Sequence, residues 1–330
     1  MVWETDKTPL HSAAEFGAKE LTVALLSKHK LLNLPDTPWT GAHSFTPFHL
    51  AVRNGHLDVA HLLLEHGASP ESSTPEGLTP LHLASITGYP EVVEFLIDAG
   101  ANINAKLDTN LKSPLFYAAG NGRKETVRLL LDRGAKAKSF DDNQSTPLHW
   151  AAKRGKSECA KLLLDAGAEI DHREELNYSP LELAAQGGFL KMTSLLIDRG
   201  ANVDGQNGYA LMYAVTGNYP DVVREVLRAG ASKKMTDSYG AGGTALHYAG
   251  RNGRVELVKL LLEEGSSDFD IDKSDSWGDT PLTETLRYLS NHSENSIKVV
   301  QLLVEHGADV NKEGCQRRFG PRSTHTVTLC

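Results

Sequence analysis

The sequence predicts an all-α repeat solenoid, in which helix-turn-helix units stack in a row and are joined by finger loops. The motif Thr8-Pro9-Leu10-His11 recurs along the chain, in complete or partial copies that begin at residues 8, 46, 79, 113, 146, 179, 209, 244 and 280. Successive copies begin 30 to 38 residues apart, with a spacing near 33. A fixed period of this length indicates units that pack on their neighbours and share no single central core.

Each motif is expected to begin the first helix of its repeat. In the second copy, the Thr46 side chain can cap the helix, and Pro47 follows at a position where its missing N–H costs nothing. Leucine starts the buried stripe in most copies, and a small residue such as Ala51 lets helices approach closely. A glycine such as Gly55 should end the helix in the left-handed conformation. Asn218 takes that role in the seventh repeat, as the next best residue type.

The second helix of each repeat carries paired aliphatic residues, such as Leu63-Leu64, and stops at another glycine, such as Gly67. A polar turn follows, for example Asn102-Ile103-Asn104, and predicts a projecting β-hairpin finger. The seventh copy, Tyr209-Ala210-Leu211, lacks both the capping residue and the proline. Local fraying is therefore expected there.

These motifs, with their glycines and their period, resemble the ankyrin repeat family over residues 1–311. The resemblance implies stacked helix pairs with β-hairpin fingers along one edge. It also implies a concave face, made by fingers and first helices, that binds proteins. Five motif histidines would brace the neighbouring fingers in such a fold: His11, His49, His82, His149 and His247. Residues 312–330 carry no repeat pattern and are expected to be disordered.

Composition narrows the class of function. No run approaches the ~20 apolar residues of a membrane span, and no signal-peptide pattern opens the chain. A net charge of -8 argues against nucleic acid as a partner. Three cysteines without metal-site spacing fit a reducing compartment. We therefore expect a monomeric protein of the cytoplasm or nucleus.

The residues that could carry chemistry have structural explanations, so we predict no catalytic, cofactor-binding or metal-binding residue. His56, His61 and His66 lie five apart, which turns them away from one another around a helix. Gly155-Lys156-Ser157 lacks the earlier glycine of a phosphate-binding loop. Cys159 is expected to pack as a small hydrophobic residue.

Three segments depart from the regular pattern. Residues 31–45, which include Trp39, lengthen the first finger, and an insertion around residues 287–296 separates the helices of the last repeat. Each is either a partner-binding loop or a tolerated surface insertion. Gly240-Ala241-Gly242-Gly243 is either an anion site at a helix start or a flexible finger tip.

The candidate partner-binding residues lie at the ends of first helices and in the fingers. Four cations at the helix ends stand out on an otherwise acidic chain: Arg53, Lys153, Arg154 and Arg251. Exposed Arg, Tyr and Trp are enriched at binding hot spots. The predicted set is Arg53, Asn54, Lys112, Lys153, Arg154, Tyr178, Arg251 and Trp277. We expect these residues to bind an acidic or mixed segment of a partner protein. The alternative is that they are ordinary solvated residues.

The favoured function is a scaffold or adaptor for protein–protein interaction. One rival is an enzyme or small-molecule binder that uses the concave groove, although an open groove excludes water poorly. Another is an accessory subunit of a larger enzyme complex, which sequence cannot separate from an adaptor because a fold does not fix a function.

Overall fold

The computed structural model describes residues 7–28, 44–205, 208–237, 242–264, 269–288 and 294–314. These residues form eighteen α-helices, as the repeat pattern predicts, and no named strand. The helices are α1 (Pro9–Glu15), α2 (Lys19–Lys28), α3 (Pro47–Arg53), α4 (Leu57–Glu65), α5 (Pro80–Thr87), α6 (Pro90–Asp98), α7 (Pro114–Gly120), α8 (Lys124–Asp132), α9 (Pro147–Lys153), α10 (Ser157–Asp165), α11 (Pro180–Gln186), α12 (Leu190–Asp198), α13 (Tyr209–Gly217), α14 (Pro220–Arg228), α15 (Ala245–Arg251), α16 (Val255–Glu263), α17 (Pro281–Arg287) and α18 (Glu294–Glu305).

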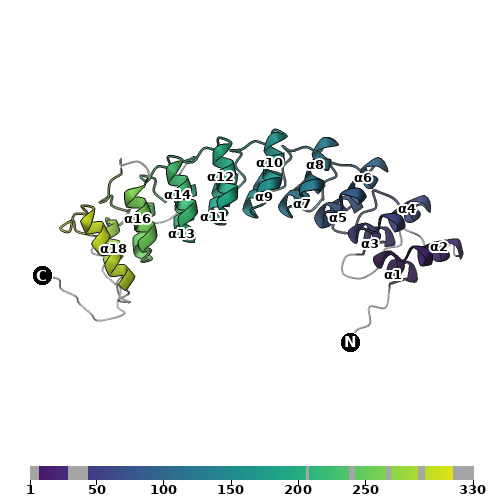
Figure 1. Cartoon of the computed structure of the whole chain (residues 1–330), viewed down its shortest axis with the longest axis horizontal. Coiled ribbons are helices and arrows are strands. Elements are labelled where there is room, and N and C mark those ends of the chain that lie inside the picture. Colours follow the sequence, from purple (N-terminus) through teal and green to yellow (C-terminus); the bar gives the residue numbers. More distant parts are fainter. Residues whose placement is uncertain are drawn as a thin grey trace, which may run out of the picture. The chain divides into compact units, whose positions relative to one another are not determined.

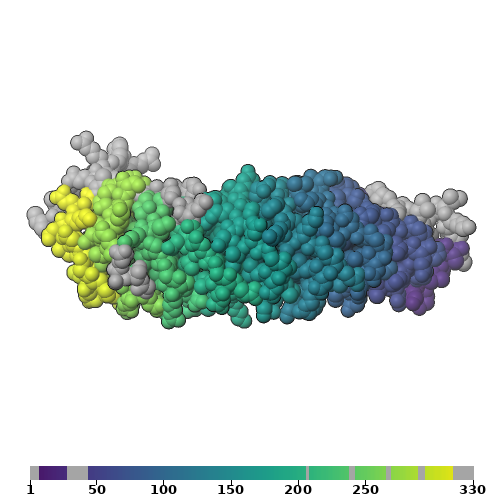
Figure 2. Space-filling model, turned by 90° about the horizontal axis from the view of Figure 1, so that it is seen from above, coloured from purple at the N-terminus to yellow at the C-terminus, as the bar shows by residue number. Residues whose placement is uncertain are grey.

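The chain divides into two compact units, residues 1–202 and residues 203–330. The first unit holds repeats 1 to 6, with helices α1 to α12, and the second holds repeats 7 to 9, with helices α13 to α18. Within each unit the first helices pack on one another in chain order, as α7 does on α9 and α15 on α17 (Figure 1). On the face shown in Figure 2, side chains close the space between successive repeats of each unit.

The first helices begin as the motif predicts. Thr146 has extended backbone before α9, and its side chain accepts the N–H of His149. The His149 ring in return accepts the N–H of Thr146 at Nδ1, at 3.2 Å. This reciprocal capping box satisfies two N–H groups that the helix start would leave without partners. The leucines that follow form the core: Leu148 on α9 and Leu163 on α10 are fully buried.

The left-handed residues after the first helices are also confirmed. Gly155 has a φ of +65°, and a Cβ there would lie 2.6 Å from the Phe189 ring. Asn218 adopts the same conformation in the seventh repeat, with a φ of 61°. In that repeat α13 begins at Tyr209, which occupies the position of the capping Thr or Ser of the other repeats. Gly208 precedes the helix and provides no side-chain cap. The missing cap and proline therefore move the helix start by one residue.

The β-hairpin form of the fingers is not confirmed. Among the described residues, the one bridge between extended residues joins Thr236 to Thr244. In the finger at residues 141–145 a side chain holds the turn where strand pairing was expected. Asp141 Oδ1 accepts the N–H groups of Asn143 and Ser145 at 3.1 and 2.8 Å. One backbone bond also closes this finger, from the N–H of Asp141 to the carbonyl of Ser145 at 2.9 Å, so the carboxylate takes the donors that a longer strand ladder would use.

Several predicted features lie outside the described residues. These are Trp39 and residues 31–43 of the lengthened first finger, residues 289–293 of the insertion in the last repeat, Gly240 and Ala241 of the glycine-rich segment, and residues 315–330 of the C-terminal segment.

Candidate functional site

A groove with a volume of about 630 Å³ lies in the first unit, between repeats 5 and 6. Its walls come from the first helices α9 and α11 and from the fingers at residues 141–145 and 174–178. Its lining residues are Asp141, Asn143, Ser145, His149, Trp150, Lys153, Arg154, Glu174, Glu175, Leu176, Tyr178, Leu183 and Gln186. We call this feature the repeat 5–6 groove.

The motif histidine of α9 positions the far wall of the groove. His149 is buried and donates from Nε2 to the carbonyl oxygen of Tyr178, at 3.2 Å. The backbone N–H of Glu174 donates to the same carbonyl, at 3.1 Å. The N–H of Glu175 donates across to the carbonyl of Asn143, at 2.9 Å. The two fingers are thus tied to each other and to α9, which gives the groove a preformed wall.

Trp150 forms the centre of the near wall. Its indole N–H donates to Asp141 Oδ2 at 3.3 Å. Two cations lie close to its ring, Lys112 with Nζ at 4.5 Å from the ring centroid and Arg154 with its guanidinium carbon at 5.0 Å. Lys112 is also 3.8 Å from Asp141 Oδ2. These cation–π contacts hold both side chains in place beside the groove.

The charges that remain available in the groove are of both signs. Arg154 donates to Asn121 Oδ1 at 3.1 Å and keeps further N–H groups. Lys153 and Glu175 are exposed, and neither side chain has a hydrogen bond or ion pair to a described residue. Leu176 adds an apolar surface, with 71% of its area exposed.

The structure brings together four of the eight predicted residues. Lys153, Arg154 and Tyr178 line the repeat 5–6 groove, and Lys112 stacks on its tryptophan. Arg53 and Asn54 lie farther toward the N-terminus at the end of α3. There Arg53 stacks on Phe45 at 5.4 Å, and Asn54 donates to the carbonyl of Glu15.

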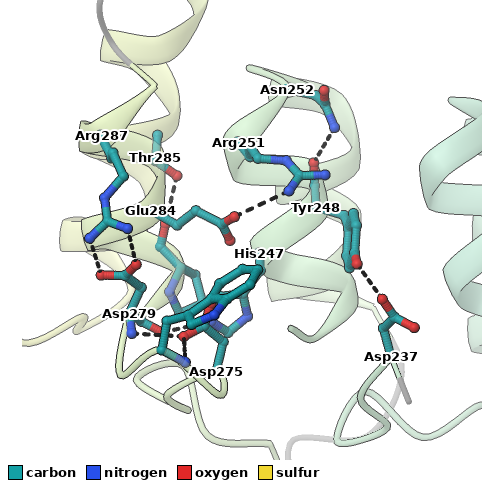
Figure 3. Close-up of polar contacts among 12 residues, drawn as sticks. Asp237, His247, Tyr248, Arg251, Asn252, Asp275, Asp279, Glu284, Thr285 and Arg287 are labelled. Carbon is teal, nitrogen blue, oxygen red and sulfur yellow. Dashed lines mark hydrogen bonds and ion pairs between the residues drawn. The ribbon is translucent and has the colours of Figure 1, made fainter. Parts of the chain in front are cut away.

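The remaining two predicted residues lie in the second unit, where Arg251 belongs to a polar cluster (Figure 3) and the backbone N–H of Trp277 donates to Asp275 of that cluster. Arg251 lies 3.4 Å from Glu284, and its guanidinium carbon is 4.8 Å from the centroid of the Tyr248 ring. Burial raises the pKa of Glu284, and the carboxylates of Asp275 and Asp279 raise it further against the opposing effect of Arg251. Burial also raises the pKa of Tyr248, whose hydroxyl donates to Asp237 at 2.6 Å.

Sequence reasoning missed the acidic residues of the groove and the exposure of Trp150. The tryptophan packs between repeats, since its ring centroid lies 6.5 Å from that of Tyr117. It also lines the groove. Asp141, Glu174 and Glu175 occur in fingers rich in polar residues, where no sequence signal separates a groove wall from a solvated turn.

The residues considered for other chemistry have local roles. Burial raises the pKa of the Cys159 thiol to about 11, so the thiol is protonated at neutral pH. The three closely spaced histidines each have a different partner. His56 contacts the carbonyl of Glu15, His61 stacks on Phe95, and His66 contacts the carbonyl of Leu62. Within the described ranges no three His, Cys, Asp or Glu side chains are arranged to hold a metal ion. Nor does that part of the chain contain a helix long and apolar enough to span a membrane.

Comparisons with known proteins identify the family of the repeats. A family model described as ankyrin repeats (3 copies) matches residues 10–107, 105–174, 171–237 and 211–314. The chain is 38% identical over 138 residues to "Probable 26S proteasome regulatory subunit p28" of Saccharomyces cerevisiae, which covers 41% of this chain and 59% of that protein. It is 31% identical over 154 residues to the B-cell lymphoma 3 protein homolog of Mus musculus, which covers 36% of this chain and 32% of that protein. The chain thus spans less than two thirds of the length of these relatives.

Proposed function

The chain belongs to the ankyrin repeat family, whose repeats generally act as protein-interaction modules, and on that premise we propose that it is a scaffold or adaptor that binds a partner protein in the repeat 5–6 groove. The observation that carries the proposal is the position of Lys153 and Arg154 on the wall of a preformed groove, opposite Tyr178. A binding role is supported by a groove wall in which buried His149 holds the neighbouring finger in place.

We propose a partner segment that carries an acidic residue with an apolar residue beside it. Lys153 and Arg154 would attract its carboxylate, and the partner's apolar side chain would cover Leu176 and the rim of Trp150. Arg and Trp are residue types in which binding energy concentrates, especially where neighbouring contacts exclude water. We further propose that the protein acts as a monomer in the cytoplasm or nucleus.

Affinity capture from cell lysate tests the proposal. The tagged chain is compared with the Lys153→Glu/Arg154→Glu variant, and we expect a partner that is retained by the first and lost from the second. The matched control is Lys161→Glu/Lys191→Glu, which makes the same charge change at exposed positions of the second helices α10 and α12. Equal capture by the groove variant, or equal loss from the control, would count against the groove, provided that the melting temperatures of all three proteins agree.

A second candidate function is an accessory subunit of a larger enzyme complex. The likeness to a protein named as a proteasome regulatory subunit favours it, although that match covers 41% of this chain. Sedimentation of the lysate through a density gradient separates the two candidates. An accessory subunit would move with a large assembly, whereas a simple adaptor would stay near the size of one or two proteins.

A further inference from the structure

Repeat 9, the last repeat that the structure describes, exposes a leucine at a position that the other repeats bury. Leu286 lies six residues after the start of its motif copy, near the end of α17, and is 42% exposed. In the eight preceding repeats the residue at this position is buried: Ala14, Val52, Ser85, Ala119, Ala152, Ala185, Val215 and Gly250. The position faces the following repeat, because a Cβ on Gly250 would collide with the side chain of Thr285 on α17. Leu286 therefore lies on the face of repeat 9 that a following repeat would cover.

The second helix of repeat 9 is incompletely covered as well. Val300 on α18 is partly exposed, whereas the equivalent residues of repeats 2 to 8 are buried: Ala60, Val93, Val127, Ala160, Thr193, Val223 and Val258. Ile297 and Val304 are 51% and 42% exposed, and they lie on the same side of the helix as Val300. Because α18 packs on α16 of the preceding repeat, its uncovered side is the one that a following repeat would meet. We call Leu286, Ile297, Val300 and Val304 the repeat 9 end face.

The last described residues lead the chain to the edge of this face. The N–H of Asp309 donates to the carboxylate of Asp272 in the finger of repeat 9, at 3.0 Å. Gly314 then lies against α17, where a Cβ on it would be 3.0 Å from the Cβ of Thr283. Thr283 and Leu286 are three residues apart and are therefore neighbours on the surface of the helix. The segment that follows Gly314 thus starts beside the end face.

Residues 315–330 are long enough to cover the end face. In repeat 5 the twelve residues 142–153, which follow the position equivalent to Gly314, contain the whole of helix α9, and here sixteen residues follow it. Phe319 is a large apolar residue within about 17 Å of Gly314 along an extended chain. The segment also carries three arginines: Arg317, Arg318 and Arg322. These would give it the polar outer surface that the terminal units of a solenoid need.

We propose that residues 315–330 bind over the repeat 9 end face, with the Phe319 ring covering Leu286 in the place that the first helix of a following repeat would take. A segment without a repeat pattern of its own can become ordered when it binds such a surface. A second copy of the chain or a helix of another protein could also cover the face. The segment is favoured over both because its attachment at Gly314 gives it a high effective concentration there. The proposal does not depend on the repeat 5–6 groove, which lies in the other unit.

The reactivity of an introduced thiol in the full chain tests the proposal. Leu286→Cys places the thiol on the end face, and Cys315→Ser with Cys330→Ser removes the two cysteines of the segment. Its rate of reaction with 5,5′-dithiobis(2-nitrobenzoate) is measured with and without Phe319→Ser. We expect a roughly tenfold faster reaction in Phe319→Ser, because the apolar ring no longer shields the thiol.

The matched control is Leu190→Cys in the same background. Leu190 lies on α12 of the first unit and is 40% exposed, so its replacement should react at a rate that Phe319→Ser does not change. Equal rates at the end face with and without Phe319→Ser would overturn the proposal, as would the same acceleration in the control. Protection that depends on protein concentration would assign the face to a second copy instead. Protection that appears only after cell lysate is added would assign it to another protein.

Hydrogen exchange provides a second measurement that leaves Leu286 in place. The amides of α17 should exchange faster in Phe319→Ser than in the unaltered chain, whereas those of α9 in the first unit should exchange equally in both. Unchanged exchange in α17 would overturn the proposal. Circular dichroism confirms that each variant is folded before the rates are compared.

Discussion

His149 links two neighbouring repeats by donating from its ring Nε2 to the backbone carbonyl of Tyr178, at 3.2 Å. Its other nitrogen, Nδ1, accepts the N–H of Thr146. A ring that donates on one side and accepts on the other is neutral. The same arrangement recurs where His49 contacts Ser72 and His82 contacts Lys112. Neutral histidines are therefore part of what holds the first unit together.

The chain is predicted to lose stability in weak acid. Burial lowers the pKa of His49, His82 and His149 from 6.5 to about 4. Because the unfolded chain then binds more protons than the folded one, each histidine contributes stability that is complete above pH 6.5 and is lost as the pH falls towards 4. Each contribution amounts to roughly 3 kcal/mol. Urea unfolding of the full chain at a series of pH values measures the effect.

The matched variant for this prediction is His149→Gln, which removes one titrating group. Its unfolding free energy should be lower at pH 7 but should depend less steeply on pH below 6.5. An unchanged slope would mean that His149 is not one of the groups that take up the protons.

The buried ion pair of repeat 6 is predicted to contribute more to the stability of the folded chain than the exposed ion pairs do. Glu182 replaces the motif histidine there, and it binds Arg173 through two bonds of 3.0 and 3.1 Å. Glu182→Ala would leave the Arg173 guanidinium, whose side chain is 15% exposed, without its carboxylate, at a cost of about 3 kcal/mol. Arg199→Ala, which breaks the exposed pair with Asp165, should cost less than about 1 kcal/mol. Chemical denaturation of both variants checks the order, and a similar cost for the two would refute it.

The repeat pattern could be predicted from sequence because each motif residue acts on its own helix. The Thr–Pro start of α9 and the left-handed Asn218 are such local features. Which of the predicted surface cations are paired could not be predicted in this way. Arg251 pairs with Glu284, which lies 33 residues away in the next repeat. Whether a surface cation is free or paired depends on such contacts, which the repeat period aligns but does not specify.

The internal structure of the fingers could not be predicted from the sequence either. Their positions follow from the period, but their internal structure depends on which side chain takes up the turn N–H groups. Asp141 and Asp275 do so in two of the fingers. We expected strand pairing in these two fingers, but their turns are built around a carboxylate. A short Asp side chain can accept backbone N–H groups two to four residues ahead.

Lys233 is predicted to stabilise the second unit from a buried position. It is 5% exposed, and its ammonium group donates to the carbonyls of Leu261 and Glu264 at 2.9 and 3.0 Å. These carbonyls lie at the end of α16, where Glu264 has extended backbone and forms no left-handed cap. Lys233→Met would leave both acceptors unsatisfied, at a cost of about 1–3 kcal/mol.

Hydrogen exchange measures this effect at the place where it arises. The backbone amides of α16 should exchange faster in Lys233→Met than in the unaltered chain. Lys234→Met changes an exposed neighbour and serves as the control. Equal protection of α16 in the two variants would show that the lysine does not act as its cap.

The seventh repeat is predicted to open more readily than its neighbours. Helix α13 begins after Gly208 with no side-chain cap, and it ends at Asn218 in the left-handed conformation. Residues 208–228 should therefore exchange faster than residues 245–263 in the next repeat. Asn218→Ala should add about 1 kcal/mol of destabilisation, because alanine tolerates a φ of 61° less well than asparagine. Asn252→Ala, at a position with a φ of -91°, should cost less. If the two alanine variants unfold at the same denaturant concentration, backbone strain at Asn218 is not what weakens this repeat.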